Sequence, residues 1–122
     1  MADTSTNFTD FSTHRNSSVQ NVPVTAKSGE GNLLGWIVYN PNATDVYLKV
    51  FDATSSGVVS VGTTAPTISP LLIPATSQVV LENQGHSQFR FASGLHYFVT
   101  TGVADSSTAN VTTPLEITFY IT

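Results

Sequence analysis

The side chains that most often carry out acid–base or metal chemistry are few in this sequence of 122 residues, which has eight Asp and Glu residues and three His residues. A glycosidase needs two carboxyl groups about 5–9 Å apart. Asp45 and Asp52 bracket one apolar run, and as the ends of a strand they would lie about 23 Å apart. The spacing of the other carboxylates indicates no pair, and the D-x-D-x-D pattern of a calcium loop is missing. The carboxylates therefore predict no catalytic pair.

The histidines and serines give the same result. His14, His86 and His96 lack the H-x-H or H-x₃-H spacing of metal ligands, and we expect His96, on the strand face that it shares with Phe98, to be packed or half-exposed. The chain has no Cys, which excludes disulfides, thiolate zinc sites and cysteine nucleophiles. Serine is abundant, but there is no G-x-S-x-G elbow and no glycine-rich phosphate loop. We expect no enzyme activity, no metal and no cofactor.

Charge is scarce in this sequence. Only 10% of the residues are charged, with 4 Lys and Arg and a net charge of −4, whereas an ordinary domain has about 25%. Four scattered cations cannot neutralise a row of phosphates, so we expect neither nucleic-acid binding nor attachment to an anionic membrane. About 32 residues are Ser or Thr, and this composition favours β-structure or a surface that packs against other protein. No apolar stretch is long enough to span a bilayer.

From Val19 onward, short apolar runs alternate with turn residues, which predicts strands. The expected strands cover 19–26, Leu33–Asn40, Asp45–Asp52, Ile68–Pro74, Ser77–Asn83, Gln88–Ala92, Leu95–Gly102 and 114–122. One further short strand is expected around Val58–Val61, within a long loop at Thr54–Pro70. With no pattern long enough for a helix, the sequence predicts one all-β domain, an antiparallel β-sandwich or jelly roll of about eight strands.

The two runs Leu33–Asn40 and Asp45–Asp52 are separated by about four turn residues, which predicts a hairpin. In the second run, Val46, Leu48 and Val50 alternate with Tyr47, Lys49 and Phe51. Because both faces carry large apolar groups, the outer face needs a cover, either from a neighbouring part of this chain or from another protein. The residues expected in the core are Trp36, Val38, Leu48, Val50, Ile117 and Phe119.

The first 18 residues are polar and show neither helical nor strand periodicity. They predict an N-terminal arm (1–18) ahead of a β-sandwich domain (19–122). The arm is either a frayed terminus or an extended segment whose Phe8 and Phe11 dock on a neighbouring subunit. The loop at Thr54–Pro70 is a second candidate contact surface, through Thr63, Thr64 and Pro66.

The aromatic residues allow one alternative function. A carbohydrate-binding module would use exposed rings as a platform on which sugars stack. The residues that could build such a platform are Trp36, Tyr39, Tyr47, Phe51, Tyr97 and Tyr120. The other interpretation places some of these rings in the core and the rest in a subunit interface.

The order of segments resembles a family of small virion proteins of tailed bacteriophages, cyanophages among them. The resemblance covers Asn32 to Thr122. It is carried by four stretches of strand and turn: GWIVYN (35–40), VYLKVFDA (46–53), VGTTAPTIS with LLIPA (61–75), and FASGLHYFVTTGVAD (91–105). These motifs are not catalytic, and the N-terminal arm lies outside them.

The resemblance implies a non-enzymatic β-sandwich on the virion, a capsid decoration (cement) protein that binds the major capsid protein. Because closed symmetry is the usual form of an oligomer and capsid axes favour threefold assemblies, we expect a homotrimer. The start MADTSTNFTD has no apolar core of a signal peptide, so we expect synthesis in the host cytoplasm and a location on the capsid surface. A tail, neck or fibre-associated role is the alternative.

Overall fold

Alternating apolar residues build two antiparallel sheets in the computed structural model, which describes residues 11–81 and 86–122. The described strands are β1 (Ser12–Val19), β2 (Val24–Ser28), β3 (Gly31–Asn40), β4 (Val46–Asp52), β5 (Leu71–Ile73), β6 (Ser77–Leu81), β7 (Phe89–Phe91), β8 (Gly94–Thr100) and β9 (Leu115–Ile121). A single 3₁₀ turn, η1 (Ser56–Val58), is the one helical element among them. The expected all-β sandwich is confirmed.

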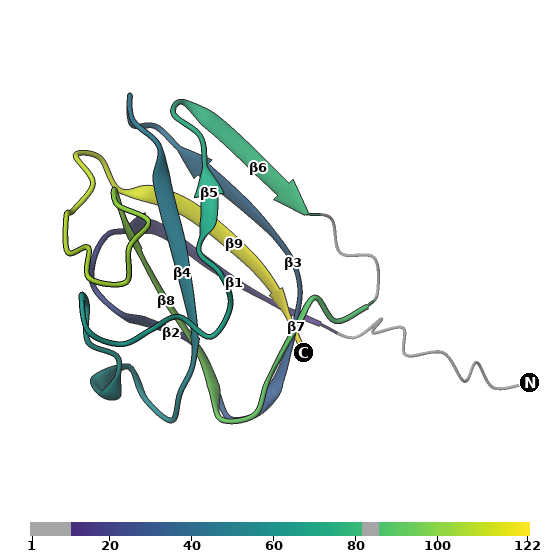
Figure 1. Ribbon diagram of the computed structural model, residues 1–122. Coiled ribbons are helices and arrows are strands. Elements are labelled where there is room, and N and C mark those ends of the chain that lie inside the picture. The colour runs from purple at the N-terminus through teal and green to yellow at the C-terminus, as the bar shows by residue number, and fades with distance from the viewer. Residues whose placement is uncertain (1–10, 82–85) are drawn as a thin grey trace, which may run out of the picture.

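The two sheets face each other across one core (Figure 1). The five-stranded sheet has the order β1-β9-β3-β6, and β7 also pairs with β3. β6 pairs with the Trp36–Asn40 part of β3 and β7 with the Gly31–Leu33 part, so the two share one edge of that strand. The four-stranded sheet has the order β2-β8-β4-β5. β1 and β2 are therefore edge strands, one in each sheet.

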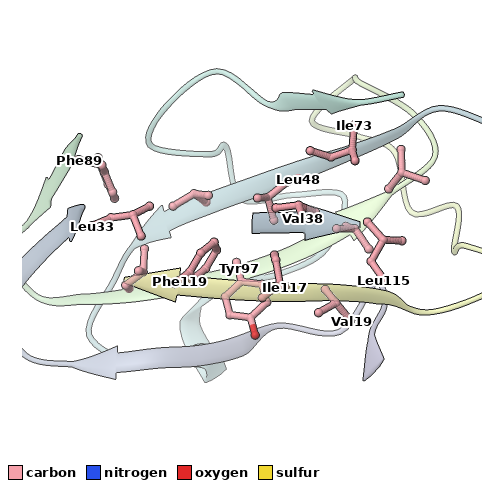
Figure 2. Close-up of a cluster of buried hydrophobic side chains, with 14 of the residues drawn as sticks. Val19, Leu33, Val38, Leu48, Ile73, Phe89, Tyr97, Leu115, Ile117 and Phe119 are labelled. Atoms are coloured by element: carbon pink, nitrogen blue, oxygen red, sulfur yellow. The ribbon is translucent and has the colours of Figure 1, made fainter. Parts of the chain in front are cut away.

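The core lies between the sheets and is made by every second residue of their strands (Figure 2). In β9, Leu115, Ile117, Phe119 and Ile121 are buried and their neighbours point outward, as period-2 alternation predicts. Five of the six expected core residues are at most 1% exposed, and the sixth, Trp36, is partly buried against the same cluster. These core predictions are confirmed.

The predicted hairpin between β3 and β4 is wrong, because the two strands belong to different sheets. The residues between the two strands instead carry the chain from the five-stranded sheet to the four-stranded sheet. Asn40 is fully buried, and its Nδ2 donates to the main-chain oxygens of Thr44, Ile73 and Pro74 at 3.0–3.2 Å. Asn42 pairs with Thr113 in the manner of a backbone residue, through Nδ2 to the carbonyl (2.8 Å) and Oδ1 from the N–H (2.7 Å).

The short strand predicted around Val58–Val61 is also wrong. The chain there forms η1 and an irregular loop, in which Thr63 and Thr64 donate their backbone N–H to Ser60. Gly62 has a φ of 81°, and a Cβ at this position would lie 2.5 Å from Thr108. An extended strand cannot continue through such a residue. The apolar run is explained by packing of Val59 and Val61 on the sheet rather than by backbone pairing.

The predicted boundary between arm and sandwich at residue 18 differs from the structure. Ser12–Ser18 belong to β1, which pairs with β9 from Ser12 opposite Ile121 to Val19 opposite Leu115. The pattern did not indicate this strand because its inward positions are polar. His14 and Asn16 lie opposite the buried residues Phe119 and Ile117, and they face the interior as hydrogen-bonding groups.

A second crossing between the sheets, from β7 to β8, depends on Asp52 at the end of β4. The carboxylate accepts the backbone N–H groups of Ala92 (2.8 Å), Ser93 (2.9 Å) and Gly94 (3.2 Å). Burial acts to raise the pKa of Asp52, but the three N–H donors and the nearby His96 stabilise the carboxylate and hold its pKa below the ordinary value of 3.8.

Replacing Phe119 with Ala should lower the free energy of unfolding by about 3–5 kcal/mol, because the ring is fully buried and its loss leaves a cavity. Chemical denaturation measures this loss. Val80→Ala, at a position half exposed on the same sheet, is the control and should change stability by less than about 0.5 kcal/mol. A loss below about 1 kcal/mol for Phe119→Ala would contradict its place in the core.

Replacing Asp52 with Asn should cost about 1–3 kcal/mol at neutral pH, because an amide nitrogen then faces backbone N–H donors. The lowered pKa means that the stabilising effect of the carboxylate is complete above pH 3.8 and is lost as the pH falls through the folded-state value. Denaturation curves at neutral and acid pH should therefore show the wild type approaching the variant in acid. Glu30→Gln, at an exposed carboxylate, is the control. A constant difference between wild type and Asp52→Asn across this range would refute the role of ionisation.

Candidate interaction surfaces

The outer face of the four-stranded sheet is covered by the chain itself over β8 and most of β4, whereas Leu72 of β5 on the same face is 49% exposed. Phe51 and Phe98 stack there with ring centroids 5.0 Å apart, and the buried Val59 packs on them. Val59 comes from the loop between β4 and β5, which lies on this side of the sandwich (Figure 1). The sequence allowed this face to be covered either by another part of this chain or by another protein. In the structure, this chain supplies the cover that is present.

A buried lysine lies on the same covered face. Lys49 is 1% exposed, and its Nζ donates to the main-chain oxygen of Ala104 at 2.7 Å. Burial lowers the pKa of Lys49, and the negative charge of Asp105 acts in the opposite direction. Because its carbonyl partner lies in the loop between β8 and β9, this lysine ties a second loop over the sheet.

His96 is also part of this cover. The side chain is 1% exposed, and its two ring nitrogens bond to Ala53 O (2.8 Å) and Thr25 Oγ1 (3.0 Å). Because a carbonyl only accepts, Nε2 carries a proton, and Nδ1 bonds to the threonine hydroxyl, which can both donate and accept. His96 is packed, one of the two states expected of it, and both of its nitrogens serve to attach neighbouring segments.

The outer face of the five-stranded sheet has the opposite character. Among the described residues, Phe11, Tyr39 and Val80 on this face are 47%, 38% and 50% exposed. Phe11 packs edge-on against Tyr120 with ring centroids 5.6 Å apart. We call this surface the bare face; it is formed by Phe11, Arg15, Ile37, Tyr39, Gln78, Val80, Glu116, Thr118 and Tyr120. It presents apolar and hydroxyl groups with one charge of each sign.

A shallow groove of about 300 Å³ runs along the bare face. Its lining includes Ile37, Tyr39 and Gln78 on one side and Arg15, Glu116 and Thr118 on the other. Arg15 Nη2 and Glu116 Oε1 are 3.5 Å apart, with side chains 73% and 52% exposed. An ion pair so open to water adds little stability, so both groups remain free to bond to a partner.

The residues expected to contact other subunits are divided between opposite sides of the sandwich. Phe11 lies on the bare face, and Phe8 lies outside the described residues. Thr63, Thr64 and Pro66 lie in the loop that covers the four-stranded sheet. Thr63 is exposed, whereas Thr64 is partly buried and its Oγ1 accepts the N–H of Ser60 at 2.8 Å. The Thr64 side chain therefore stabilises the conformation of the loop through this hydrogen bond.

The bare face includes Ile37 and Val80, which were not predicted from the sequence as contacts, and Tyr39, which was one of the aromatics expected in a sugar platform, the core or a subunit interface. A signal for two of them was present. The run Leu33–Tyr39 is apolar almost without interruption, so its alternate residues place large groups on both faces of β3. Since Trp36 and Val38 face the core, Ile37 and Tyr39 must face outward.

The six aromatics that could have formed one sugar platform are separated. Phe51 and Tyr97 are buried, on the two faces of the four-stranded sheet. Tyr47 lies on the outer face of that sheet, and Tyr39 and Tyr120 are on the bare face. Trp36 packs on the core. The combined platform is not formed.

In the described part of the chain, no group of three or more His, Asp or Glu side chains is arranged to hold a metal ion. Within the same residues, there is no helix with the length and hydropathy needed to cross a bilayer.

No protein-family model, curated protein or solved structure matches this chain.

Proposed function

We propose that this chain is a non-enzymatic structural protein of a bacteriophage virion, a capsid decoration protein that binds the lattice of the major capsid protein and reinforces the head. The proposal combines the resemblance of Asn32–Thr122 to small phage virion proteins with the geometry of the two outer faces. The bare face is the observation that carries it.

The bare face has the composition of a docking surface for protein. Phe11, Tyr39 and Tyr120 supply aromatic area, the residue class enriched at the centre of interfaces. Arg15 and Glu116 are the charged side chains among its residues, so a partner would desolvate few charges on contact. On the other outer face, loops already cover Phe51 and Phe98, and Leu72, at 49% exposed, is the exposed large apolar residue of its described strands.

Contact surfaces on opposite sides of a subunit suit a cement protein. The bare face and the loop that carries Thr63 lie on the two sides of the sandwich (Figure 1). A subunit that contacts one neighbour through each side can bridge them. Repeated copies on a lattice then add their binding energies through avidity. Association of three copies about a capsid axis is part of the proposal, because closed oligomers are the usual form.

The test measures co-sedimentation of the purified chain with capsid shells of the phage that encodes it. The double variant Phe11→Ser/Val80→Ser removes apolar area from the bare face at two half-exposed positions. We expect its affinity for shells to fall at least about tenfold, because truncating a central interface residue costs more than about 1 kcal/mol. Sedimentation equilibrium of the free wild-type protein should give the mass of a trimer.

Val22→Ser is the matched control, because Val22 is 61% exposed but lies in the connection between β1 and β2. It should bind shells like the wild type. Thr63→Arg tests the opposite side and should also weaken binding if the subunit bridges two neighbours. A wild-type protein that ignores shells but binds purified tails would replace the capsid role with the tail or neck role. A signal on a glycan array, lost in Tyr39→Ser, would replace it with carbohydrate binding.

A further inference from the structure

Tyr97 is the largest of the fully buried side chains, and it brings a hydroxyl group to the open edge of the sandwich. The ring packs edge-on against Phe119 with centroids 5.0 Å apart. Figure 2 shows its oxygen directed away from the apolar cluster toward β1. There it lies 2.6 Å from His14 Nε2 and 3.1 Å from Asn16 Nδ2. Both partners come from the edge strand.

The direction of each hydrogen bond in this group follows from one backbone N–H. At the irregularity of β1, the N–H of Ser18 donates to Asn16 Oδ1 at 2.9 Å. This contact identifies the amide oxygen of Asn16, so its Nδ2 must be the atom that donates to the Tyr97 oxygen. Since the phenol already accepts that bond, its own O–H is available to donate to His14 Nε2.

The arrangement that gives the Tyr97 O–H an acceptor has His14 accepting at Nε2, which means a neutral ring with its proton on Nδ1. A protonated imidazole has N–H groups at both nitrogens and cannot accept. It would turn the short contact with Tyr97 into one between two donors, unless the phenol rotates its proton away from the only acceptor it has in this group. In the first case the contact becomes repulsive. In the second, His14 donates to the Tyr97 oxygen and the phenol O–H is left without an acceptor in this group, so both responses weaken the hold on β1.

We propose that the chain Ser18–Asn16–Tyr97–His14 is a proton-sensitive latch, which holds the edge strand β1 on the sandwich at neutral pH and releases it when His14 takes up a proton. β1 is suited to such a device because it pairs on one side only, with β9. Val19 at its end is packed in the apolar core, but the inward side chains of His14 and Asn16 are held by hydrogen bonds. Release would leave the edge of β9 unpaired, and an unpaired edge is a template for a strand of another chain.

The surroundings of His14 favour the neutral ring. Tyr97 faces it from β8 and Phe119 from β9, with ring centroids 5.5 and 6.3 Å away. Lys27 of β2 and His14 line the same hollow of about 270 Å³, together with Ser12, Thr13, Ala26, Ile121 and Thr122. No described residue of this lining carries a carboxylate side chain. Lys27 is a cation, and its Nζ donates to the main-chain oxygen of Thr122, the last residue of the sequence, at 3.0 Å. The charged pair Arg15–Glu116 belongs to the bare face, on the other side of the sheet.

The pKa values agree with this geometry. Burial lowers the pKa of His14 from its ordinary value of 6.5. Burial also raises the pKa of Tyr97 to about 12, partly offset by the Asn16 hydrogen bond, so the phenol keeps its proton throughout this range. Because the neutral ring is favoured in the closed state, docking of β1 is at full strength above pH 6.5 and weakens as the pH falls below that value.

Hydrogen exchange of the wild-type protein measures the release directly. The protection factors of the β1 amides, corrected for the intrinsic effect of pH, should fall several-fold between about pH 7.5 and about pH 5. The ceiling is about 30-fold, set by complete protonation of a released histidine of ordinary pKa. Amides of the central strand β8 should not change. Equal protection of β1 at both pH values would overturn the proposal.

Two variants separate the latch from a general effect of acid. In His14→Gln the amide oxygen can accept from Tyr97 but does not titrate, so protection of β1 should become independent of pH. His86→Gln removes an exposed histidine that has no bond to this network and should behave like the wild type. Loss of β1 protection in acid that persists in His14→Gln refutes the latch.

The tautomer provides a check that needs no variant. Nitrogen-15 NMR of the wild-type protein at about pH 7.5 should find the proton of His14 on Nδ1, whereas an unconstrained histidine favours the other nitrogen. A proton on Nε2 at neutral pH would contradict the donor order and the proposal with it. These measurements use the free protein and do not depend on capsid binding. A failure of the latch proposal can therefore be distinguished from a failure of the proposed function.

Discussion

The structure depends on satisfying the backbone where the chain passes from one sheet to the other. Among the described strands, only the connections β4–β5 and β6–β7 stay within one sheet. Where the chain crosses from one sheet to the other, its backbone N–H and C=O groups no longer pair with a neighbouring strand and need other hydrogen-bond partners. Asn40, Asn42 and Asp52 supply these partners at two of the crossings, with short side chains that reach the main chain directly. Their bonds hold the two sheets in register over the core.

The same requirement accounts for the unusual composition. Amide and hydroxyl side chains can bond to the backbone without a net charge, so they serve in partly buried connections where a charged group would be costly. Thr64 and Thr67 act in this way in the loop between β4 and β5. A chain with 10% charged residues can therefore satisfy the polar groups of a many-crossing sandwich. The charged residue that is buried, Lys49, joins the cover of one sheet through a main-chain oxygen.

The outer faces of the two sheets differ, although strands β3 and β4 both carry apolar residues on both sides. The chain covers only the outer side of β4. The loop over Phe51 and Phe98 makes that face part of the folding core. The corresponding side of β3, with Ile37 and Tyr39, is not covered by the described part of the chain. The two sheets therefore differ in how much of their outer apolar surface the chain itself covers, and exposed apolar area of this kind is typical of interaction sites.

Alternation along single strands was enough to predict much of this protein. In β4 and β9 the inward and outward residues follow from period 2, and with them most of the core, including Leu48, Ile117 and Phe119. Alternation states which side of a strand is buried, but it does not state which strand lies beside it. β3 and β4 therefore looked like a hairpin, and only tertiary structure placed them in different sheets.

β1 shows the limit most clearly. Its inward residues His14 and Asn16 are polar, and their partner Tyr97 lies 83 and 81 positions away along the chain. No local pattern can indicate a strand that is held by a distant hydroxyl group. The composition and periodicity of the sequence by themselves determined an all-β chain with a defined buried side on its apolar strands. The sheet partners, the covered face and the polar edge were decided by tertiary structure, because each depends on groups that meet only when the sheets close.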